Sequence, residues 1–312
     1  MNSVDHEITA APGRQVEGSL LDFVALAKPR ILMMVLITTS GSFWLAAGGR
    51  DFERLLYTLV GFGLVVSGAN ALNMYIERDT DRLMTRTQGR PLPAGRLQPR
   101  MAMVFGLVMI GLGFPIVIAL VNLVSALVIF VSLGLYVLVY TPLKRHSSFA
   151  LLVGSIPGAA PPLVGWTAAT GTLEIPGDLP GLILFAVLFL WQVPHFLAIS
   201  LFRKDEYARA GLQLLPLEID DESAKHQAIF YLLALVPVSL LLVTVGAAGM
   251  IYLAAALLGG LVFLGVGLLG LRKNAGEAWA RQLFIVSLLY LTGIFGALVL
   301  DQIVGSRLAQ LG

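Results

Sequence analysis

Three polar residues recur at intervals of four near the end of a long apolar stretch: Asn73, Glu77 and Asp81. In a helix this spacing keeps the three side chains within about 80° of one another, and Asn70 falls on the same face. Two carboxylates and an amide offer hard oxygen ligands, the type that magnesium prefers. The spacing therefore favours a magnesium site on this face.

Basic residues follow at the same interval on an adjoining face, at Arg82 and Arg86, and Arg90 comes shortly after. Their guanidinium groups could bind phosphate oxygens in a bidentate manner. A solvated helix end with ion pairs along the helix would also explain any one of these charges. It does not explain Asn70 and Asn73, which lie inside the apolar stretch, where polar groups are costly and usually functional.

A second polar cluster comprises Lys204, Asp205, Glu206 and Tyr207. Two acidic clusters on one face of a helical bundle would suit the binding of a metal-bridged polyanion from two sides. We therefore consider Asp205 and Glu206 as candidate catalytic residues and Asp205 as a further metal ligand. An ordinary loop beside the membrane explains these charges equally well.

Two smaller features remain. Tyr140 is followed by Lys144 and Arg145, whose charges could neutralise a leaving diphosphate or simply anchor a helix end at the membrane. His195 lies on an apolar segment after Pro194, where a structural role, a base and a contact to haem are all open.

The elements that position these residues are transmembrane helices. The chain has 312 residues, of which 57% are hydrophobic and 13% charged, and its mean hydropathy is +0.84. A soluble domain cannot bury so much apolar surface, and about 20 apolar residues cross a bilayer as a helix. Nine stretches qualify: 30–48, 55–75, 101–121, 123–140, 149–168, 180–201, 228–248, 250–271 and 283–303. We predict an all-α bundle of nine transmembrane helices, with a central cavity opened by kinks at prolines.

The distribution of basic residues predicts the orientation of this bundle. Of the 21 lysines and arginines, 18 fall on the side of the N-terminus, which places that terminus in the cytoplasm and the C-terminus outside. We expect a cytoplasmic tail over residues 1–27, one transmembrane domain over 28–304 and a short extracytoplasmic tail over 305–312. A net charge of +2 favours no nucleic-acid partner, and the absence of cysteine excludes disulfides and thiolate metal sites.

At these motifs the chain resembles a known family. Residues 73–81 are similar to the N-x-x-x-(D/E)-x-x-x-D motif of the UbiA-type intramembrane prenyltransferases. Further segments resemble the protoheme IX farnesyltransferase (haem O synthase) branch of that family: residues 90–92, 140–145, 158–166, 191–196 and 204–207. The resemblance runs in order over about residues 25–300.

The resemblance implies nine helices around a central cavity and a defined reaction at the cytoplasmic face of the cell inner membrane. Farnesyl diphosphate, haem b and water would give haem O and diphosphate, with Mg²⁺ as the cofactor. Asn73, Glu77 and Asp81 would be metal ligands and, with Lys144, catalytic residues. Substrate-binding roles would fall to a further set: Asn70, Arg82, Arg86, Arg90, Tyr140, Arg145, His195, Lys204 and Tyr207. Haem A synthase is the expected consumer of the product.

The sequence departs from the family pattern at two places. The wider family favours aspartate at the position of Glu77, whereas the haem branch accepts glutamate. The second aspartate-rich motif is replaced by Lys204 and the three residues after it. Three alternatives stay open: a prenyltransferase with an aromatic acceptor such as a hydroxybenzoate, a secondary transporter and a structural membrane subunit.

Overall fold

The structure, a computed structural model, describes residues 18–209 and 220–311, and for residues 306–311 the backbone alone. Within these residues it contains helices and no strand. The long helices are α2 (Pro29–Ala47), α3 (Phe52–Asp81), α4 (Pro99–Leu120), α5 (Leu123–Gly134), α7 (Ala150–Thr170), α8 (Leu179–Phe202), α11 (Asp221–Thr244), α12 (Met250–Leu268) and α13 (Glu277–Leu311). Shorter pieces are α1 (Leu20–Leu26), the π-helix η1 (Leu135–Tyr140), α6 (Thr141–Leu143), α9 (Lys204–Arg209) and the 3₁₀-helix η2 (Leu269–Leu271).

Each of the nine predicted stretches is helical in the described part of the chain, which confirms the all-α class. Among the residues that the structure describes, eight helices are long and apolar enough to cross a membrane, counting α5, η1 and α6 as one span over Leu123–Leu143. The ninth, α7, is not among these eight; it contains Pro157, Pro161 and Pro162, and most of its residues are buried. Helices α3 and α13 extend beyond their predicted stretches, because their polar ends remain helical outside the apolar segment.

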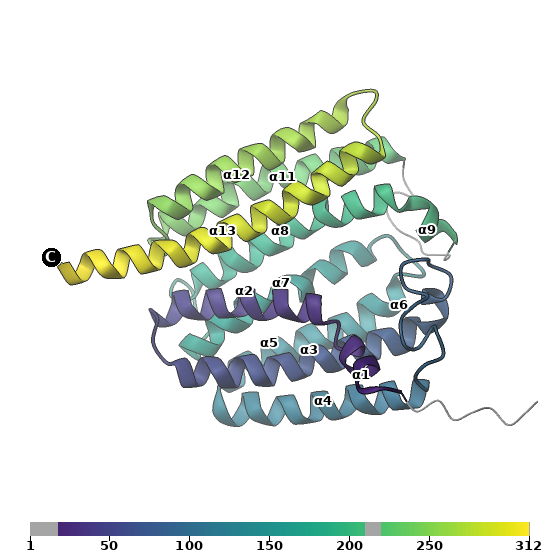
Figure 1. Cartoon of the computed structure of the whole chain (residues 1–312). Coiled ribbons are helices and arrows are strands. Elements are labelled where there is room, and N and C mark those ends of the chain that lie inside the picture. The colour runs from purple at the N-terminus through teal and green to yellow at the C-terminus, as the bar shows by residue number, and fades with distance from the viewer. Residues whose placement is uncertain (1–17, 210–219, 312) are drawn as a thin grey trace, which may run out of the picture.

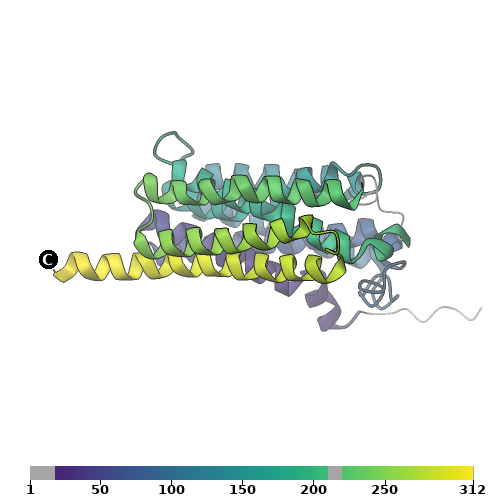
Figure 2. The same cartoon turned by 90° about the horizontal axis from the view of Figure 1, so that it is seen from above.

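The long helices run roughly alongside one another, so that their connections gather at the two ends of the bundle (Figures 1 and 2). One end carries α6, α9 and the segment 82–98, and the C-terminal end of α13 projects from the opposite end (Figure 1). Large apolar side chains such as Leu127, Phe130 and Leu258 are exposed on the flanks. An exposed apolar surface of this kind is expected where lipid surrounds the protein.

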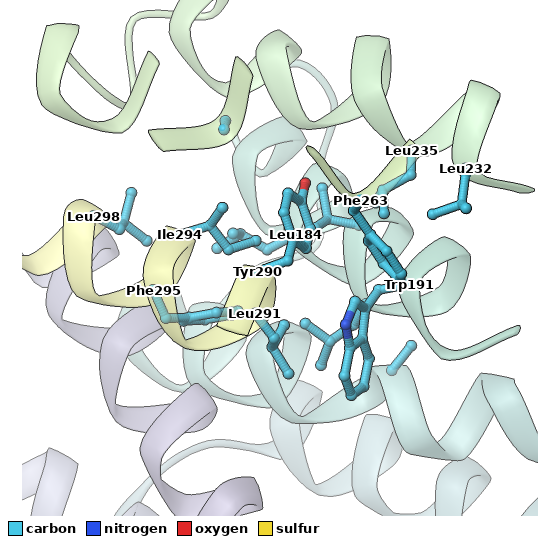
Figure 3. Packing of buried hydrophobic residues seen from close by; sticks show 14 of the residues in the cluster. Leu184, Trp191, Leu232, Leu235, Phe263, Tyr290, Leu291, Ile294, Phe295 and Leu298 are labelled. Carbon is cyan, nitrogen blue, oxygen red and sulfur yellow. The ribbon is translucent and has the colours of Figure 1, made fainter. Parts of the chain in front are cut away.

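The largest core lies among α8, α11, α12 and α13. Trp191, Phe263 and Tyr290 meet there with leucines from neighbouring helices (Figure 3). Helix α8 packs against α7, α11 and α13. It therefore joins the C-terminal helices to the rest of the bundle.

Helices α3 and α4 approach closely along a line of glycines. A Cβ at Gly68 would lie 2.5 Å from the carbonyl oxygen of Gly106, and a Cβ at Gly106 would lie 3.0 Å from that of Gly68. Only residues without a side chain allow this separation. The contact fixes the helix that carries Asn73, Glu77 and Asp81.

The predicted tails at residues 1–27 and 305–312 stay predictions, and parts of both are helical. Residues 1–17 lie outside the described part, whereas residues 20–26 form α1, which Ser19 caps through a reciprocal hydrogen bond with Asp22. Most of the predicted extracytoplasmic tail continues α13, which ends at Leu311. The central cavity stays a prediction.

Candidate active site

The predicted line of polar residues lies on the buried face of α3. Asn70, Asn73 and Asp81 are between 1% and 3% exposed, and the side chain of Glu77 is also largely covered. The carboxylates come at the helix end, whereas the two amides lie deeper in the apolar segment. A buried polar residue needs a partner, and each of these four has one from a different part of the chain.

The first partner is Lys28, at the junction of α1 and α2. Its Nζ lies 2.6 Å from Oδ1 of Asn73, and Asn70 Nδ2 donates to the Ala27 carbonyl at 3.0 Å. Lys28 has a left-handed backbone, with φ at +51°, which costs a residue with a Cβ about 1–2 kcal/mol. Burial, and then the nearby charge of Arg90, lowers the pKa of Lys28 to about 7.

The second partner comes from the π-helix η1 and the turn after it. The hydroxyl of Thr141 donates to the Tyr136 carbonyl at 2.7 Å and accepts from Nδ2 of Asn73 at 3.1 Å. Lys144 Nζ lies 2.9 Å from Oε1 of Glu77 and 4.3 Å from the centre of the Tyr140 ring. The π-helical turn, a feature that often marks functional sites, thus sets the register of Thr141 and Lys144 against α3.

The ring of Tyr140 is itself seated on a glycine. A Cβ at Gly154 of α7 would lie 2.4 Å from Cε2 of Tyr140. The absence of a side chain at Gly154 therefore allows the position of the ring that Lys144 covers.

The third partner is Arg90, whose Nη1 lies 2.7 Å from Oδ2 of Asp81. Arg90 belongs to the segment 82–98, which folds back over α1 and α3 with Leu92 and Leu97 buried in a shared cluster. Arg96 in the same segment pairs with Asp22 of α1 at 2.9 Å. The Arg96 guanidinium and the Ser19 hydroxyl hold the pKa of Asp22 below its usual range.

Other residues predicted for this site lie at its edge. Arg145 is exposed and donates to the Ile76 carbonyl at 3.1 Å. Arg82 is exposed, 4.0 Å from Asp79, and Arg86 is exposed too. Within the described residues, none of these three arginines forms an ion pair with Glu77 or Asp81.

The second polar cluster forms the short helix α9, near the same end of the bundle (Figure 1). Lys204 pairs with Asp221 at 2.6 Å, and Glu206 pairs with Arg203 at 2.9 Å. Asp205 is exposed, and Tyr207 is partly covered. No hydrogen bond or ion pair between described residues joins this cluster to the carboxylates of α3, so a shared metal site stays a prediction.

His195 is buried in α8, where its Nδ1 lies 2.7 Å from Oγ of Ser287 on α13. Sequence reasoning missed Lys28, Thr141 and Ser287 as parts of these sites. Lys28 adjoins Pro29, which marks a helix start, but nothing in the spacing of Thr141 or Ser287 indicates a polar contact across the bundle.

The oxygen donors of α3 suit magnesium in their chemistry. Within the described residues, no group of three or more histidine, aspartate or glutamate side chains is arranged to hold a metal ion. Magnesium is commonly held by one or two carboxylates together with substrate phosphates rather than by a complete protein cage. The side chains of Asn73, Glu77 and Asp81 offer the oxygen ligands that such a partial role requires.

Sequence comparison identifies the class of protein that has this all-helical membrane bundle. The chain belongs to the UbiA prenyltransferase family, whose model matches residues 35–289. A protoheme IX farnesyltransferase of Myxococcus xanthus is 49% identical over 282 residues, covering 90% of this chain and 95% of the relative. One from Sorangium cellulosum is 50% identical over 282 residues, covering 86% and 99%.

Solved structures share the fold. A digeranylgeranylglyceryl phosphate synthase in membranes superposes with a TM-score of 0.77 at 17% identity, covering 91% of this chain and 98% of that one. A UbiA homologue from Archaeoglobus fulgidus bound to GPP and Mg²⁺ gives a TM-score of 0.65 at 15% identity, covering 89% and 99%.

Proposed function

We propose that this chain transfers the farnesyl group of farnesyl diphosphate to a vinyl group of haem b, giving haem O and diphosphate. The observation that carries the proposal is the buried line of Asn73, Glu77 and Asp81, each contacted by a different polar partner on a separate segment. The similarity of this chain to two protoheme IX farnesyltransferases supports farnesyl diphosphate and haem b as the substrates.

The chemistry needs stabilisation of a departing diphosphate. The C–O bond of farnesyl diphosphate breaks, the allylic cation is captured by the vinyl group, and water then adds to the resulting cation with loss of a proton. Magnesium, held by Asn73, Glu77 and Asp81, would supply charge neutralisation at the diphosphate. Lys144 and Arg90 would donate to its oxygens as negative charge develops, which is where electrostatic stabilisation acts most strongly.

Lys28 would bind the same group from the deeper side. Because Asn73 Oδ1 is its contact, the ammonium lies within reach of a diphosphate held by α3. Its left-handed backbone holds the side chain toward α3, so the strain at this residue serves the site.

The second cluster would close the opposite side of the diphosphate site. Asp205 would contribute a further metal ligand, and Lys204 and Tyr207 would contact substrate. Their place near the same end of the bundle supports this role (Figure 1). The sheltered bundle would keep bulk water from capturing the cation early.

The basic residues near the site also bear on the location and orientation of the protein in the membrane. The basic residues beside α3, α6 and α9 lie at the end of the bundle that would face the cytoplasm. We therefore infer a multi-pass protein of the cell inner membrane with its active site on the cytoplasmic side. A haem A synthase would consume the product.

The decisive experiment supplies haem b, farnesyl diphosphate and Mg²⁺ to the purified chain in nanodiscs, with product mass read after chromatography. A haem heavier by one farnesyl group and one hydroxyl group, absent with chelator, is the expected result. Prenylation of an aromatic acid without haem product would change the acceptor. No prenylation of either acceptor by folded protein would overturn the proposal and favour a transporter.

A further inference from the structure

His195 occupies a pocket of aromatic rings between α8 and α13. The residue is 8% exposed. Its ring is stacked on Trp191 at 4.6 Å between centroids, and Phe284 of α13 lies at 4.9 Å. Among the described residues no acidic side chain forms a hydrogen bond or ion pair with the ring, and the surrounding aromatic rings favour the neutral imidazole.

The hydrogen bonds of Ser287 determine which ring nitrogen carries the proton. Its Oγ lies 2.6 Å from the carbonyl oxygen of Phe284, and since a carbonyl can only accept, the hydroxyl must donate there. That uses the single hydroxyl hydrogen. The 2.7 Å contact between Ser287 Oγ and His195 Nδ1 is then a hydrogen bond donated by Nδ1–H, which leaves Nε2 with a free lone pair.

The same serine also holds the neighbouring ring. Trp191, labelled in Figure 3, donates from Nε1 to the Ser287 carbonyl at 2.7 Å. One residue of α13 therefore fixes both the imidazole and the indole that stacks on it. Histidines that ligate metals typically donate the N–H of the other ring nitrogen to such a fixed acceptor.

The remaining nitrogen is available to a ligand. No hydrogen bond from the described residues reaches Nε2 of His195. Three side-chain polar atoms in the described part of the chain are fully enclosed and have no hydrogen-bond partner: Ser42 Oγ, Gln227 Oε1 and Tyr290 OH. Nε2 of His195 also has no partner, but it is not fully enclosed. Nε2 thus keeps some accessible surface.

We propose that Nε2 of His195 is the axial ligand to the iron of the haem acceptor, and that Ser287 is the positioning residue that fixes its tautomer. A neutral imidazole whose other N–H is engaged is the common nitrogen ligand of haem iron. The proposal rests on the proposed function, because it takes haem b as the acceptor. Iron ligation would hold the porphyrin in one orientation while a vinyl group is prenylated.

The test measures ligation without turnover. The full chain in nanodiscs is titrated with ferric haem b in the absence of farnesyl diphosphate, and its absorption and EPR spectra are recorded. We expect a histidine-ligated spectrum that is lost in His195→Gly and restored by adding imidazole. A spectrum unchanged in His195→Gly would overturn the proposal.

Ser287 is tested separately, so that the proposal does not depend on the folding of one variant. Ser287→Ala should weaken haem binding by about tenfold and lower the iron–histidine stretching frequency, whereas Ser287→Thr should keep both near their normal values. The matched control is Ser155→Ala, since Ser155 is also buried and donates to a carbonyl within its own helix. Equal stretching frequencies in all four proteins would contradict the positioning role.

The outcomes separate ligation from the reaction. If the wild-type chain farnesylates haem and the haem spectrum of His195→Gly equals that of the wild type, His195 is not the iron ligand and the proposed function stands. A chain that ligates haem through His195 but forms no product would do the reverse. Loss of turnover in His195→Gly with unchanged haem binding would identify His195 as a base instead.

Discussion

Arg90 reaches back along the chain to place its guanidinium 2.7 Å from the carboxylate of Asp81, whose side chain is 1% exposed. A carboxylate so deeply covered is costly unless it is paired and hydrogen-bonded. Thr87 donates to the Asp81 carbonyl at 2.8 Å and so ties the same segment to the end of α3. Asp81 is thereby held in place by two contacts from the segment 82–98.

Asp81→Asn should reduce turnover by about 100-fold or more, the range seen when one charge-stabilising group is removed. The fold should persist, because the amide oxygen can still accept from Arg90. The turnover of Asp81→Glu should lie between that of the wild type and that of Asp81→Asn, since glutamate keeps the charge but magnesium tolerates little change in geometry. The matched control is Asp79→Asn on the same helix, where the side chain is 63% exposed. Normal turnover in Asp81→Asn would remove Asp81 from the proposed ligands.

Lys144→Met should raise the dissociation constant for magnesium diphosphate by about 10- to 150-fold, since a charge-assisted hydrogen bond contributes about 1.5–3 kcal/mol. Methionine keeps an apolar stem against the Tyr140 ring, so that the effect reports the lost charge. Titration calorimetry measures it, with the exposed Lys273→Met as the control. Equal affinities in the two variants would show that Lys144 serves only to anchor the helix end.

Gly154→Ala should displace the ring of Tyr140 and, with it, Lys144. The added Cβ would lie 2.4 Å from Cε2 of the ring, and overpacking of this kind costs about 1–3 kcal/mol. We expect a lower thermal midpoint together with weaker diphosphate binding. Gly265→Ala is the control, because a Cβ there meets nothing within 4 Å. A Gly154→Ala protein that matches this control in both measurements would contradict the seating of Tyr140.

The pairing of Asp22 with Arg96 predicts a dependence on pH outside the bundle. The pKa of Asp22 is lowered in the folded protein, so the carboxylate's contribution is present above its unfolded pKa of about 3.9 and is lost as pH falls through the folded value. Limited proteolysis of the segment 82–98 should therefore be constant from about pH 5 to 8 and should increase in stronger acid. In Asp22→Asn cleavage should already be fast at neutral pH.

Much of the fold follows from the sequence because lipid imposes a strong constraint. Each predicted stretch is helical, since a helix is the arrangement in which a single membrane-crossing segment satisfies its own backbone polar groups. The alignment of Asn73, Glu77 and Asp81 follows from helix periodicity alone, whereas the burial of Asn73 and Asp81 is seen only in the structure. The ends of the helices are harder to predict from the sequence: the apolar stretch ends near residue 75, whereas α3 continues to Asp81.

The partners of the site depend on tertiary contacts that local patterns do not encode. Nothing before Pro29 indicates that Lys28 adopts a left-handed conformation and turns toward Asn73. The stretch that contains η1 is uniformly apolar, so its π-helical turn leaves no mark in hydropathy. Ser287 likewise lies in an apolar run, and only the packing of α13 on α8 brings it to His195.

The π-helical turn at Leu135–Tyr140 also bears on how this protein can change over time. A π-helical turn takes up one residue more than an α-helical turn, so deleting one residue within it would restore a regular α-helix with little rotation of the residues that follow. The same deletion in the α-helical part of the span, α5, would instead rotate everything after it by about 100°, and Thr141 and Lys144 would then leave Asn73 and Glu77. Related active enzymes should therefore tolerate a one-residue gap at this turn more readily than elsewhere in the span.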